Sequence, residues 1–393
     1  MKRLLVISHT PHYKRGDQVV GWGPTIVELD HLSQLFEQVV HIAPLHLSPP
    51  PDSALPYHSP HICFKAIAPT GGPRLRHKAG ILHQAPRYLQ VIRQEMTRAD
   101  VLHVRCPANI SLLTLLYLAR QSHTPYRWFK YAGNWQPQGK EPWPYALQRW
   151  LLKKGVAGGV VTVNGRWPNQ PPHIYAFNNP SLTAEEVRVG KRASEIKTIH
   201  PPYALLFVGA LTTGKGVKRL LQIAKQLYTR GIPFTCHLVG DGPERPKFES
   251  WVQAHDLTTH ITFHGWLPKP MLADFYSKAH FLVFPSATEG WPKVISEAMA
   301  YGVVPIAGNV SCIPQILKET GAGAALPVHD IDAFVNTILA YGNHPQTWQA
   351  ASHAGVAAAL RFTYGAYTNA VKQLFEQAWG IMLPKSELEH TNV

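Results

Sequence analysis

The chain has 393 residues, which predicts two domains at roughly 100–200 residues each. Hydrophobic residues make up 45% of it and charged residues 16%, a balance that excludes an intrinsically disordered chain. Residues 1–185 hold 20 Lys and Arg against 9 Asp and Glu, whereas residues 186–393 hold 18 against 15. This asymmetry predicts an anionic partner for the first half: nucleic acid, phosphate or a membrane surface.

The first half alternates short apolar runs with longer amphipathic stretches, the pattern of βαβ units around a parallel sheet. The apolar run after Met1 is too short for a signal peptide and is expected to be a strand, and no run approaches the length of a membrane span. Six prolines within 44–60 predict a loop there. The expected strands are 3–8, 39–43, 101–104, 127–131 and 159–163, and the expected helices are 25–38, 80–98 and 110–121.

The second half repeats the alternation after a connection. Residues 167–202 contain six prolines and are expected to be a linker. We therefore predict two doubly wound α/β domains, 1–185 and 203–363, with ligands at the carboxyl ends of the strands in a cleft between the domains. The expected strands are 203–208, 234–239, 260–264, 281–284 and 303–306, and a last helix is expected over 364–381.

One stretch of the second half, FPSATEGWPKVISEAMAYG over 284–302, carries the most chemistry. A strand ends at Phe284, a short loop follows, and Pro292 marks a helix start, where a missing N–H costs nothing. Glu289 lies at the mouth of the loop and Glu297 lies on the helix, eight residues later. The amino end of such a helix presents N–H groups and a positive dipole, which suits a diphosphate.

This stretch resembles the E-x7-E motif of retaining GT-B glycosyltransferases of family 4, followed by their usual E-A-M-A-x-G. Four further segments are similar in order and spacing, and the resemblance covers nearly the whole chain, strongly over 203–327 and weakly over 40–200. It implies two Rossmann-like domains facing across a cleft, an acceptor domain followed by a donor domain, with helix 364–381 crossing back to the first. The four segments are FVGALTTGKG (207–216), VGDGP (239–243), FHG (263–265) and GWG (21–23).

The resemblance also implies roles for single residues. Glu289 would contact the donor sugar near the reacting centre, and Lys215 would neutralise the leaving diphosphate, so these two are the expected catalytic residues. Glu297 would hydrogen-bond the donor ribose, and Gly265 would line the base pocket. The backbone after Gly290 would cradle the diphosphate. The other expected donor-binding residues are Gly209, Gly240, Asp241, Trp291, Pro292, Lys293 and Val294.

Two departures from the family pattern concern charge and a histidine. The family usually has an Arg where this chain has Ala210, and often Gly and a hydrophobic residue where it has Pro292 and Lys293. One cation is lost and one gained near a shared ligand, so we hypothesise that Lys293 replaces the missing Arg. The family's His after the fifth strand is also absent, since the matching place reads YAGNW over 131–135.

The acceptor side has weaker candidates. Gly21 and Gly23 resemble the family's Gly loop facing the acceptor, although they could form only a turn. Arg105 follows a strand where the cleft is expected; it would contact the acceptor or form a structural salt bridge. Asn134 is a further cleft candidate. The basic amphipathic stretch 74–98 would dock on anionic lipid or be a solvated helix face, and nucleic acid is set aside because no nucleic-acid-binding motif accompanies the charge.

The resemblance therefore implies a retaining glycosyltransferase that moves a sugar from a nucleotide diphosphate sugar to a glycan or lipid-linked acceptor in cell-surface glycan synthesis. The nucleotide sugar is a co-substrate, and no metal and no other cofactor are expected. The rival functions are a nucleotide-sugar epimerase or phosphorylase of the same fold, and an inactive nucleotide-sugar-binding scaffold. The four scattered cysteines favour a reducing cytoplasm, and the basic half favours a peripheral position on the cytoplasmic membrane face.

Overall fold

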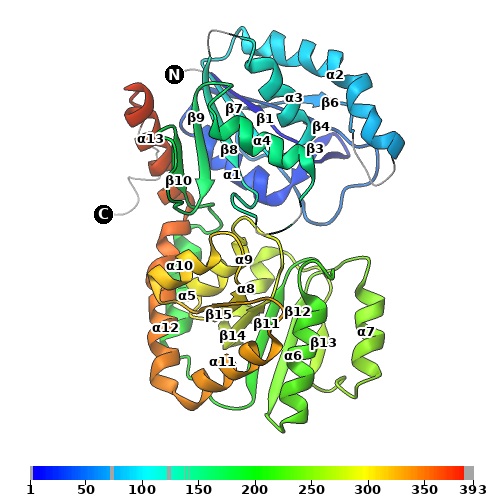
Figure 1. Ribbon diagram of the computed structural model, residues 1–393, viewed down its shortest axis with the longest axis vertical. Coiled ribbons are helices and arrows are strands. Elements are labelled where there is room, and N and C mark those ends of the chain that lie inside the picture. Colours follow the sequence, from blue (N-terminus) through cyan, green and yellow to red (C-terminus); the bar gives the residue numbers. More distant parts are fainter. Residues whose placement is uncertain (1–2, 71–74, 122–124, 138, 140, 385–393) are drawn as a thin grey trace. The chain divides into compact units, whose positions relative to one another are not determined.

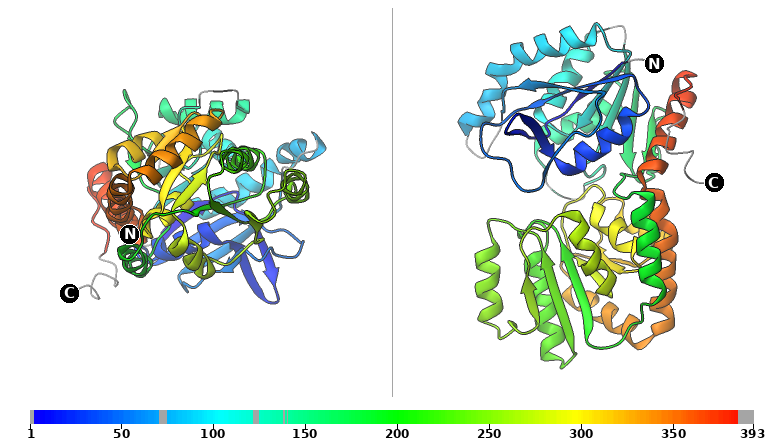
Figure 2. Two further views of the ribbon diagram at one scale, coloured as in Figure 1. Left: turned by 90° about the horizontal axis from the view of Figure 1, so that it is seen from below. Right: turned by 180° about the vertical axis from the view of Figure 1, so that it is seen from behind.

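The computed structural model describes residues 3–70, 75–121, 125–137, 139 and 141–384. The chain divides into two compact units, of which unit 1 is discontinuous. Unit 1 comprises residues 1–177 and 367–393, and unit 2 comprises residues 178–366 (Figures 1 and 2).

Unit 1 is built on a parallel sheet of seven strands in its described part. The strand order is β10-β9-β8-β7-β1-β4-β6, so the chain starts in the middle of the sheet and builds outward on both sides of β1. Its elements are β1 (Arg3–Ile7), β2 (His12–Arg15), β3 (Gln18–Trp22), α1 (Gly23–Ser33), β4 (Gln38–Pro44), β5 (Ala54–Pro56), β6 (Ile62–Ile67), α2 (Leu75–Met96), β7 (Val101–Cys106), α3 (Asn109–Leu118), β8 (Tyr126–Tyr131), α4 (Trp143–Lys153), β9 (Val160–Asn164), β10 (Ile174–Phe177) and most of α13 (Tyr364–Trp379).

Helices cover both faces of this sheet, as the apolar strands require. The helices α2, α3 and α4 pack on one face, where Ile92, Leu115 and Leu152 join a core with Val104 of β7 and Phe129 of β8. The helices α1 and α13 cover the other face, where Leu29 and Phe375 pack on the remaining strand residues. The last helix of the chain is therefore part of the first unit's core.

A small antiparallel sheet, β2-β3-β5, was not expected: β2 and β3 precede α1 in the chain, and β5 follows β4. Gly21 and Trp22 lie in β3, where Gly21 pairs with His12 and with Leu55. The expected loop over 21–23 is thus a strand end that runs directly into α1, and the expected loop over 44–60 contains β5. These strands carry mostly polar or exposed residues, so no apolar run indicates them.

Unit 2 is a second parallel sheet, of order β13-β12-β11-β14-β15-β16. The chain moves outward from β11 to β13 and then returns to place β14 on the other side of β11, which makes a topological switch point between β11 and β14. Its elements are α5 (Ala184–Glu195), β11 (Tyr203–Val208), α6 (Val217–Thr229), β12 (Phe234–Val239), α7 (Arg245–Gln253), β13 (Ile261–Phe263), α8 (Lys269–Lys278), β14 (Phe281–Phe284), α9 (Lys293–Ala300), β15 (Val304–Gly308), α10 (Ile313–Thr320), β16 (Ala324–Leu326), α11 (Ile331–Asn343), α12 (Pro345–Ala359) and η1 (Leu360–Phe362).

The linker expected over 167–202 is wrong in its extent, because it contains β10 and α5. The sequence TAEE begins α5 with a capping box: the Thr183 hydroxyl accepts from the Glu186 N–H at 3.1 Å, and the Glu186 carboxylate accepts from the Thr183 N–H at 2.7 Å. Lys197, just beyond the helix, donates to the carbonyl oxygens of Tyr276, Ala279 and Tyr301. Residues 167–177 therefore belong to unit 1 and residues 178–202 to unit 2.

Within the described residues, every helix is too short or too polar to cross a lipid bilayer.

Candidate functional site

The motif residues of unit 2 gather at the carboxyl edge of its sheet. Lys215 lies in the loop after β11, and Glu289 lies in the loop after β14, the neighbouring strand. These two loops flank the topological switch point, where open α/β sheets bind their ligands.

Glu289 and Lys215 form an ion pair with 2.7 Å between Nζ and Oε1. The Ser286 hydroxyl donates to the same carboxylate oxygen, also at 2.7 Å. The Lys215 side chain is 36% exposed and that of Glu289 only 9%. The nearly buried Glu289 carboxylate is thus fixed by two donors, one of which, Lys215, is partly exposed to solvent. The carboxylate can stabilise positive charge that develops on a ligand, and the ammonium can stabilise negative charge.

Backbone contacts tie the two loops together. Gly216 has φ +87°, and a Cβ there would lie 2.2 Å from the Pro285 carbonyl oxygen. The Ala287 N–H donates to the Gly214 carbonyl at 3.3 Å, and the Arg219 Nε–H donates to the Pro285 carbonyl at 2.8 Å. Only glycine fits at position 216, and the close approach that it allows places Lys215 on Glu289.

Three glycines make a bare backbone surface at the ends of β11, β12 and β13. A Cβ on Gly240, whose φ is +135°, would lie 2.0 Å from the Gly209 carbonyl oxygen. The Gly240 N–H donates to the Gly265 carbonyl at 2.7 Å. Asp241 turns its carboxylate back to the Gly242 N–H at 2.7 Å. The close approach of these backbones therefore requires glycine at position 240.

Glu297 lies on α9 with its side chain buried, and its Oε2 accepts from the Tyr276 hydroxyl at 3.0 Å. Burial raises the pKa of the Glu297 carboxyl, whereas Lys269, the Tyr276 hydroxyl and Lys293 act to lower it. A carboxylate has two acceptor oxygens, a property that suits the hydroxyl groups of a ribose.

The amino end of α9 has no side-chain cap, and Pro292 is its N-cap residue. The preceding residue, Trp291, is buried and stacks on Phe362 with ring centroids 4.8 Å apart. The Cys312 thiol donates to the Gly290 carbonyl at 3.4 Å. These contacts fix the loop, so Trp291 and Gly290 can meet a ligand only through their backbone.

Lys293 and Val294 are the first residues of α9 and are both half-buried. The positive charge of Lys293 acts to lower the pKa of Glu297. Its carbonyl accepts from the Ser296 hydroxyl at 2.8 Å.

The acceptor-side candidates of unit 1 are not gathered around one point. Gly21 is packed against His12 and Ile26, where a Cβ would lie within 2.8 Å of both, and Gly23 begins α1. The Asn134 carboxamide oxygen accepts from the Gln136 N–H at 3.1 Å, which closes a local turn. No described contact joins these residues to Arg105.

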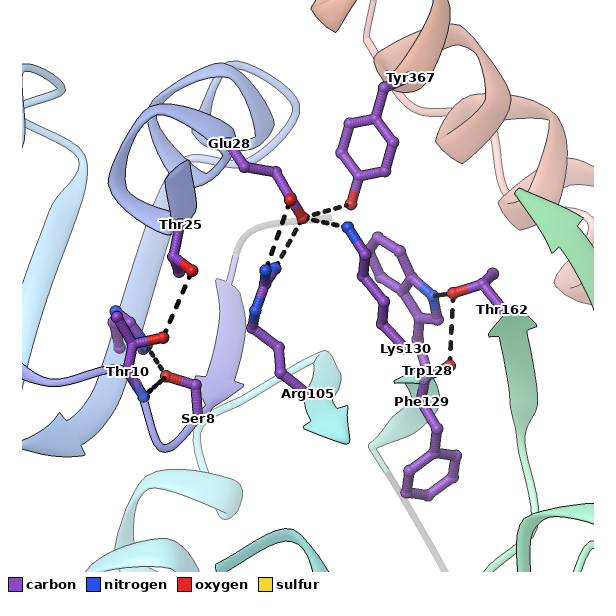
Figure 3. Close-up of polar contacts among 11 residues, drawn as sticks. Ser8, Thr10, Thr25, Glu28, Arg105, Trp128, Phe129, Lys130, Thr162 and Tyr367 are labelled. Carbon is purple, nitrogen blue, oxygen red and sulfur yellow. Dashed lines mark hydrogen bonds and ion pairs between the residues drawn. The ribbon is translucent and has the colours of Figure 1, made fainter. Parts of the chain in front are cut away.

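Arg105 forms the structural salt bridge that was one of its two expected roles. Figure 3 shows Arg105, Lys130 and Tyr367 converging on the Glu28 carboxylate. The distances to Glu28 Oε1 are 2.6 Å from Arg105, 2.5 Å from Lys130 and 3.2 Å from the Tyr367 hydroxyl. Glu28 raises the pKa of the Arg105 guanidinium against the effect of burial. The cluster joins α1, β7, β8 and α13 beneath the sheet's carboxyl edge.

A cavity of about 200 Å³ opens at this edge of unit 1, on the α3 side. It is lined by ends of β1, β4 and β7 and by the first turn of α3, so it occupies the ligand position of a doubly wound sheet. Its polar lining residues are His9, His46, Thr70, Tyr88, Asn109 and Tyr145.

The sequence did not indicate the residues that position the motif side chains from outside the motif. Ser286 stands only three residues before Glu289 and follows a strand end, a position that could have indicated it. Tyr276 and Arg219 lie on other helices and contact the motif through the fold alone. The cavity residues come from strand ends, from the loops after them and from α2, α3 and α4, and they share no pattern.

Comparisons with known proteins agree on one class. Residues 191–355 match the family model Glycosyl transferases group 1. The amylovoran biosynthesis glycosyltransferase AmsK of Erwinia amylovora is 25% identical over 147 residues, 36% of this chain and 36% of that protein. The 2-deoxystreptamine glucosyltransferase of Streptomyces kanamyceticus is 27% identical over 210 residues, 48% of this chain and 53% of that protein. The chain spans about a third to a half of the length of the curated relatives it matches.

Solved structures match over nearly the full length. The sucrose-phosphate synthase of Thermosynechococcus elongatus has a TM-score of 0.71 at 18% identity and covers 97% of this chain and 100% of its own. Anabaena Alr3699/HepE, solved in complex with UDP and glucose, has a TM-score of 0.67 at 13% identity and covers 96% and 100%. At these identities the likeness shows the fold, which is the GT-B fold.

Proposed function

Residues 191–355 form a glycosyl transferases group 1 domain on a GT-B fold, and from this premise we propose that the protein is a retaining glycosyltransferase. It moves a sugar from a nucleotide diphosphate sugar, bound by unit 2, to an acceptor bound by unit 1. The observation that carries the proposal is the Lys215–Glu289 ion pair at the switch point of unit 2, with buried Glu297 eight residues further on.

The donor site follows from the charge that the reaction develops. Cleavage of a sugar–diphosphate bond builds negative charge on the departing oxygen and positive charge on the sugar, and preorganised groups at both places stabilise the transition state. Lys215 and the N–H groups in the first turn of α9 stabilise the negative charge of the diphosphate. Glu289 stabilises the positive charge that develops on the sugar, and Glu297 accepts hydrogen bonds from the ribose hydroxyls. The bare surface at Gly240 and Gly265 takes the base.

The sugar keeps its configuration by attack from the face that the diphosphate leaves. No second carboxylate is described within contact distance of Glu289, so a paired nucleophile and acid of the hydrolase type do not carry the proposal. We propose instead that the departing phosphate oxygen takes the proton of the acceptor hydroxyl.

The acceptor is proposed to be a glycan or a lipid-linked sugar of cell-surface polysaccharide synthesis. The name of the relative AmsK, an amylovoran biosynthesis glycosyltransferase, supports this class. The cavity of unit 1 offers the His9, His46 and Asn109 side chains for sugar hydroxyls and the Tyr145 ring for an apolar sugar face.

The proposal is tested first by ligand binding. We expect UDP to raise the melting temperature of the chain more than GDP or ADP, because relatives in fold were solved with UDP. The sugar conjugates of the nucleotide that gives the largest shift are then compared in the same way to identify the donor. Lys215→Met is expected to reduce the shift, whereas the exposed Lys225→Met on α6 is the control that keeps it.

Transfer is tested next, with the donor labelled in its sugar and incubated with and without a lipid-linked sugar. Glu289→Ala is expected to lower turnover by about 10²–10³-fold, the usual cost of removing one preorganised group. Sugar release or epimerisation without acceptor would support an epimerase or phosphorylase. Identical traces for the wild type and Glu289→Ala would support an inactive scaffold.

A further inference from the structure

The basic charge of the chain is concentrated in one stretch of unit 1. Residues 75–155, which span α2 to the end of α4, hold 13 Lys and Arg but only 3 Asp and Glu. This stretch therefore carries ten of the chain's fourteen net positive charges. Its helices α2, α3 and α4 form the layer on one face of the sheet, where they share a core. Three of its cations lie instead in the strands β7 and β8, where Arg105 and Lys130 pair with Glu28 and Arg127 is buried.

The three acids of this stretch are all engaged in contacts. Glu95 pairs with Arg3 at 2.5 Å and with Lys65 at 3.5 Å. Asp100 accepts from the Arg3 N–H at 2.9 Å, and Glu141 forms an ion pair with Arg149. The cations that remain exposed on the layer's outer surface include Arg93 and Arg98. Both glutamates of the stretch are therefore paired with cations, whereas Asp100 is held by a backbone N–H.

Two tryptophan side chains are exposed on α4, a helix of the same layer. Trp143 and Trp150 of α4 are 70% and 54% exposed, although burying a Trp is strongly favourable. They are seven residues apart, so they lie on one side of the helix about 10 Å from each other. Lys154 continues the line at the helix end and is exposed. Leu147, between them, is half-buried.

The helices that carry these groups are neighbours. Figure 1 shows α2, α3 and α4 together in unit 1. Residues Arg93, Arg98 and Tyr117 line one groove, which joins the outer surfaces of α2 and α3. On α3 and just beyond it, Leu116 and Arg120 are also exposed. We name as the basic face the residues Arg93, Arg98, Arg120, Trp143, Trp150 and Lys154.

We propose that the basic face docks the protein on an anionic membrane. This rests on the proposed function, because a lipid-linked acceptor lies at such a surface. Exposed Trp beside Lys and Arg is the composition of segments that lie in a membrane interface: the indole enters the headgroup region and the cations face anionic lipid. Each cation near such a surface contributes roughly a five-fold gain in binding.

The test is co-sedimentation of the full chain with vesicles. We expect binding to vesicles of phosphatidylglycerol and phosphatidylcholine, little binding to phosphatidylcholine alone, and release by 0.5 M salt, an ionic strength chosen as roughly three times the physiological value. The triple variant Arg93→Gln, Arg98→Gln, Lys154→Gln is expected to bind about 100-fold more weakly. The variant Trp143→Ser, Trp150→Ser is expected to weaken binding by at least about ten-fold.

A matched control removes the same charge elsewhere. Lys191, Lys225 and Lys318 are exposed on unit 2, and their change to Gln is expected to leave vesicle binding within about two-fold of the wild type. Equal loss in this control would overturn the proposal, because net charge alone would then explain binding. Equal binding to neutral vesicles would overturn it too, as would binding of single-stranded RNA that vesicles do not displace.

The proposed function is tested separately in the same variants. The melting shift with UDP is expected to be unchanged in both basic-face variants, which also shows that they fold. Vesicle binding without any nucleotide shift would contradict the proposed function and leave membrane docking supported. A nucleotide shift without binding to anionic vesicles would support the proposed function and overturn membrane docking.

Discussion

At the scale of single residues, Lys293 decides how many cations the proposed diphosphate site contains. Ala210 supplies no cation after Gly209, whereas Lys293 begins α9 and acts electrostatically on Glu297. The amino end of α9, where Lys293 lies, is at one edge of the proposed donor site. A charge-assisted contact to a phosphate is stronger than a neutral hydrogen bond.

We predict that Lys293→Ala weakens UDP binding by about ten-fold, since a hydrogen bond to a charged group contributes about 1.5–3 kcal/mol and exposure reduces it. Titration calorimetry measures the change. Lys225→Ala, on the exposed side of α6, is the control of equal charge. Wild-type UDP affinity in Lys293→Ala would contradict the hypothesis that Lys293 replaces the missing Arg.

A second residue-scale feature is a closed ring of hydrogen bonds behind the loop after β1. The Thr10 carbonyl accepts from His12 Nδ1 at 2.9 Å, so His12 Nε2 accepts from the Tyr57 hydroxyl at 2.7 Å. Tyr57 in turn accepts from His41 Nδ1 at 2.6 Å, and His41 Nε2 accepts from the Ser8 hydroxyl at 2.7 Å. The Thr10 N–H closes the ring on Ser8 at 3.1 Å. Both imidazoles are neutral in this arrangement.

This ring predicts acid sensitivity of unit 1. Burial lowers the pKa of His12 from 6.5 to about 4, and burial also lowers that of His41. The unfolded chain therefore binds more protons in this interval, so stability is complete above pH 6.5 and is lost as the pH falls toward 4. The His12 contribution amounts to about 3 kcal/mol.

Urea unfolding at pH 7.5, 6 and 5 measures this dependence. His12→Gln removes one titrating group, so its free energy of unfolding is expected to fall less steeply over the same interval. The carboxylates titrate alike in both proteins and cancel in the comparison. An identical slope in His12→Gln and the wild type would show that the ring does not couple folding to pH.

At the scale of elements, the sequence predicts best where side chains are apolar on both faces. The expected strands 203–208, 234–239 and 281–284 coincide with β11, β12 and β14, because buried parallel strands read as continuous apolar runs. In contrast, β2 has the sequence HYKR and is largely exposed, so no pattern indicates it. The prolines of 167–202 led to the prediction of a linker where α5 lies, although TAEE marks the start of this helix.

The part of the site that lies on neighbouring loops of one sheet was predictable from the sequence. The E-x7-E spacing and the Lys-Gly element lie on neighbouring loops of one sheet edge, so parallel topology brings Lys215 to Glu289. Their catalytic roles stay predictions. Trp291 was expected to bind donor, yet its ring packs on Phe362, a contact between residues 71 positions apart that no local pattern encodes. Arg105 likewise needed the fold to reveal Glu28 as its partner.

The contact between the ends of β11 and β12 carries an element-scale prediction. Gly240→Ala places a Cβ 2.0 Å from the Gly209 carbonyl oxygen in a backbone conformation that L residues avoid. We expect a loss of about 2–3 kcal/mol in the free energy of unfolding of unit 2 and a loss of the UDP shift. Gly231→Ala is the control, because its φ is +66° but nothing lies within 4 Å, and it should cost about 1 kcal/mol with the shift retained. Equal effects of the two substitutions would contradict a specific need for Gly240.

At the scale of the whole molecule, the chain leaves unit 1 and returns to it. The last helix supplies apolar side chains to the sheet face that α1 also covers, and Phe375 lies there fully buried beside Phe36 and Trp128. Tyr367 enters the same unit where its hydroxyl donates to Glu28. Unit 1 can therefore complete its core only after the whole of unit 2 has been synthesised.

This discontinuity predicts which unit loses stability when the last helix is weakened. Phe375→Ala leaves a cavity in unit 1, and such substitutions cost about 3–5 kcal/mol. In differential scanning calorimetry we expect the transition that UDP does not shift to move to lower temperature, while the UDP-responsive transition of unit 2 stays in place. The exposed Leu360→Ala in η1, whose side chain is largely in solvent, is the control that should move neither transition by more than about 0.5 kcal/mol. If the UDP-responsive transition instead falls with Phe375→Ala, the last helix stabilises the donor unit and the division of the core given above is wrong.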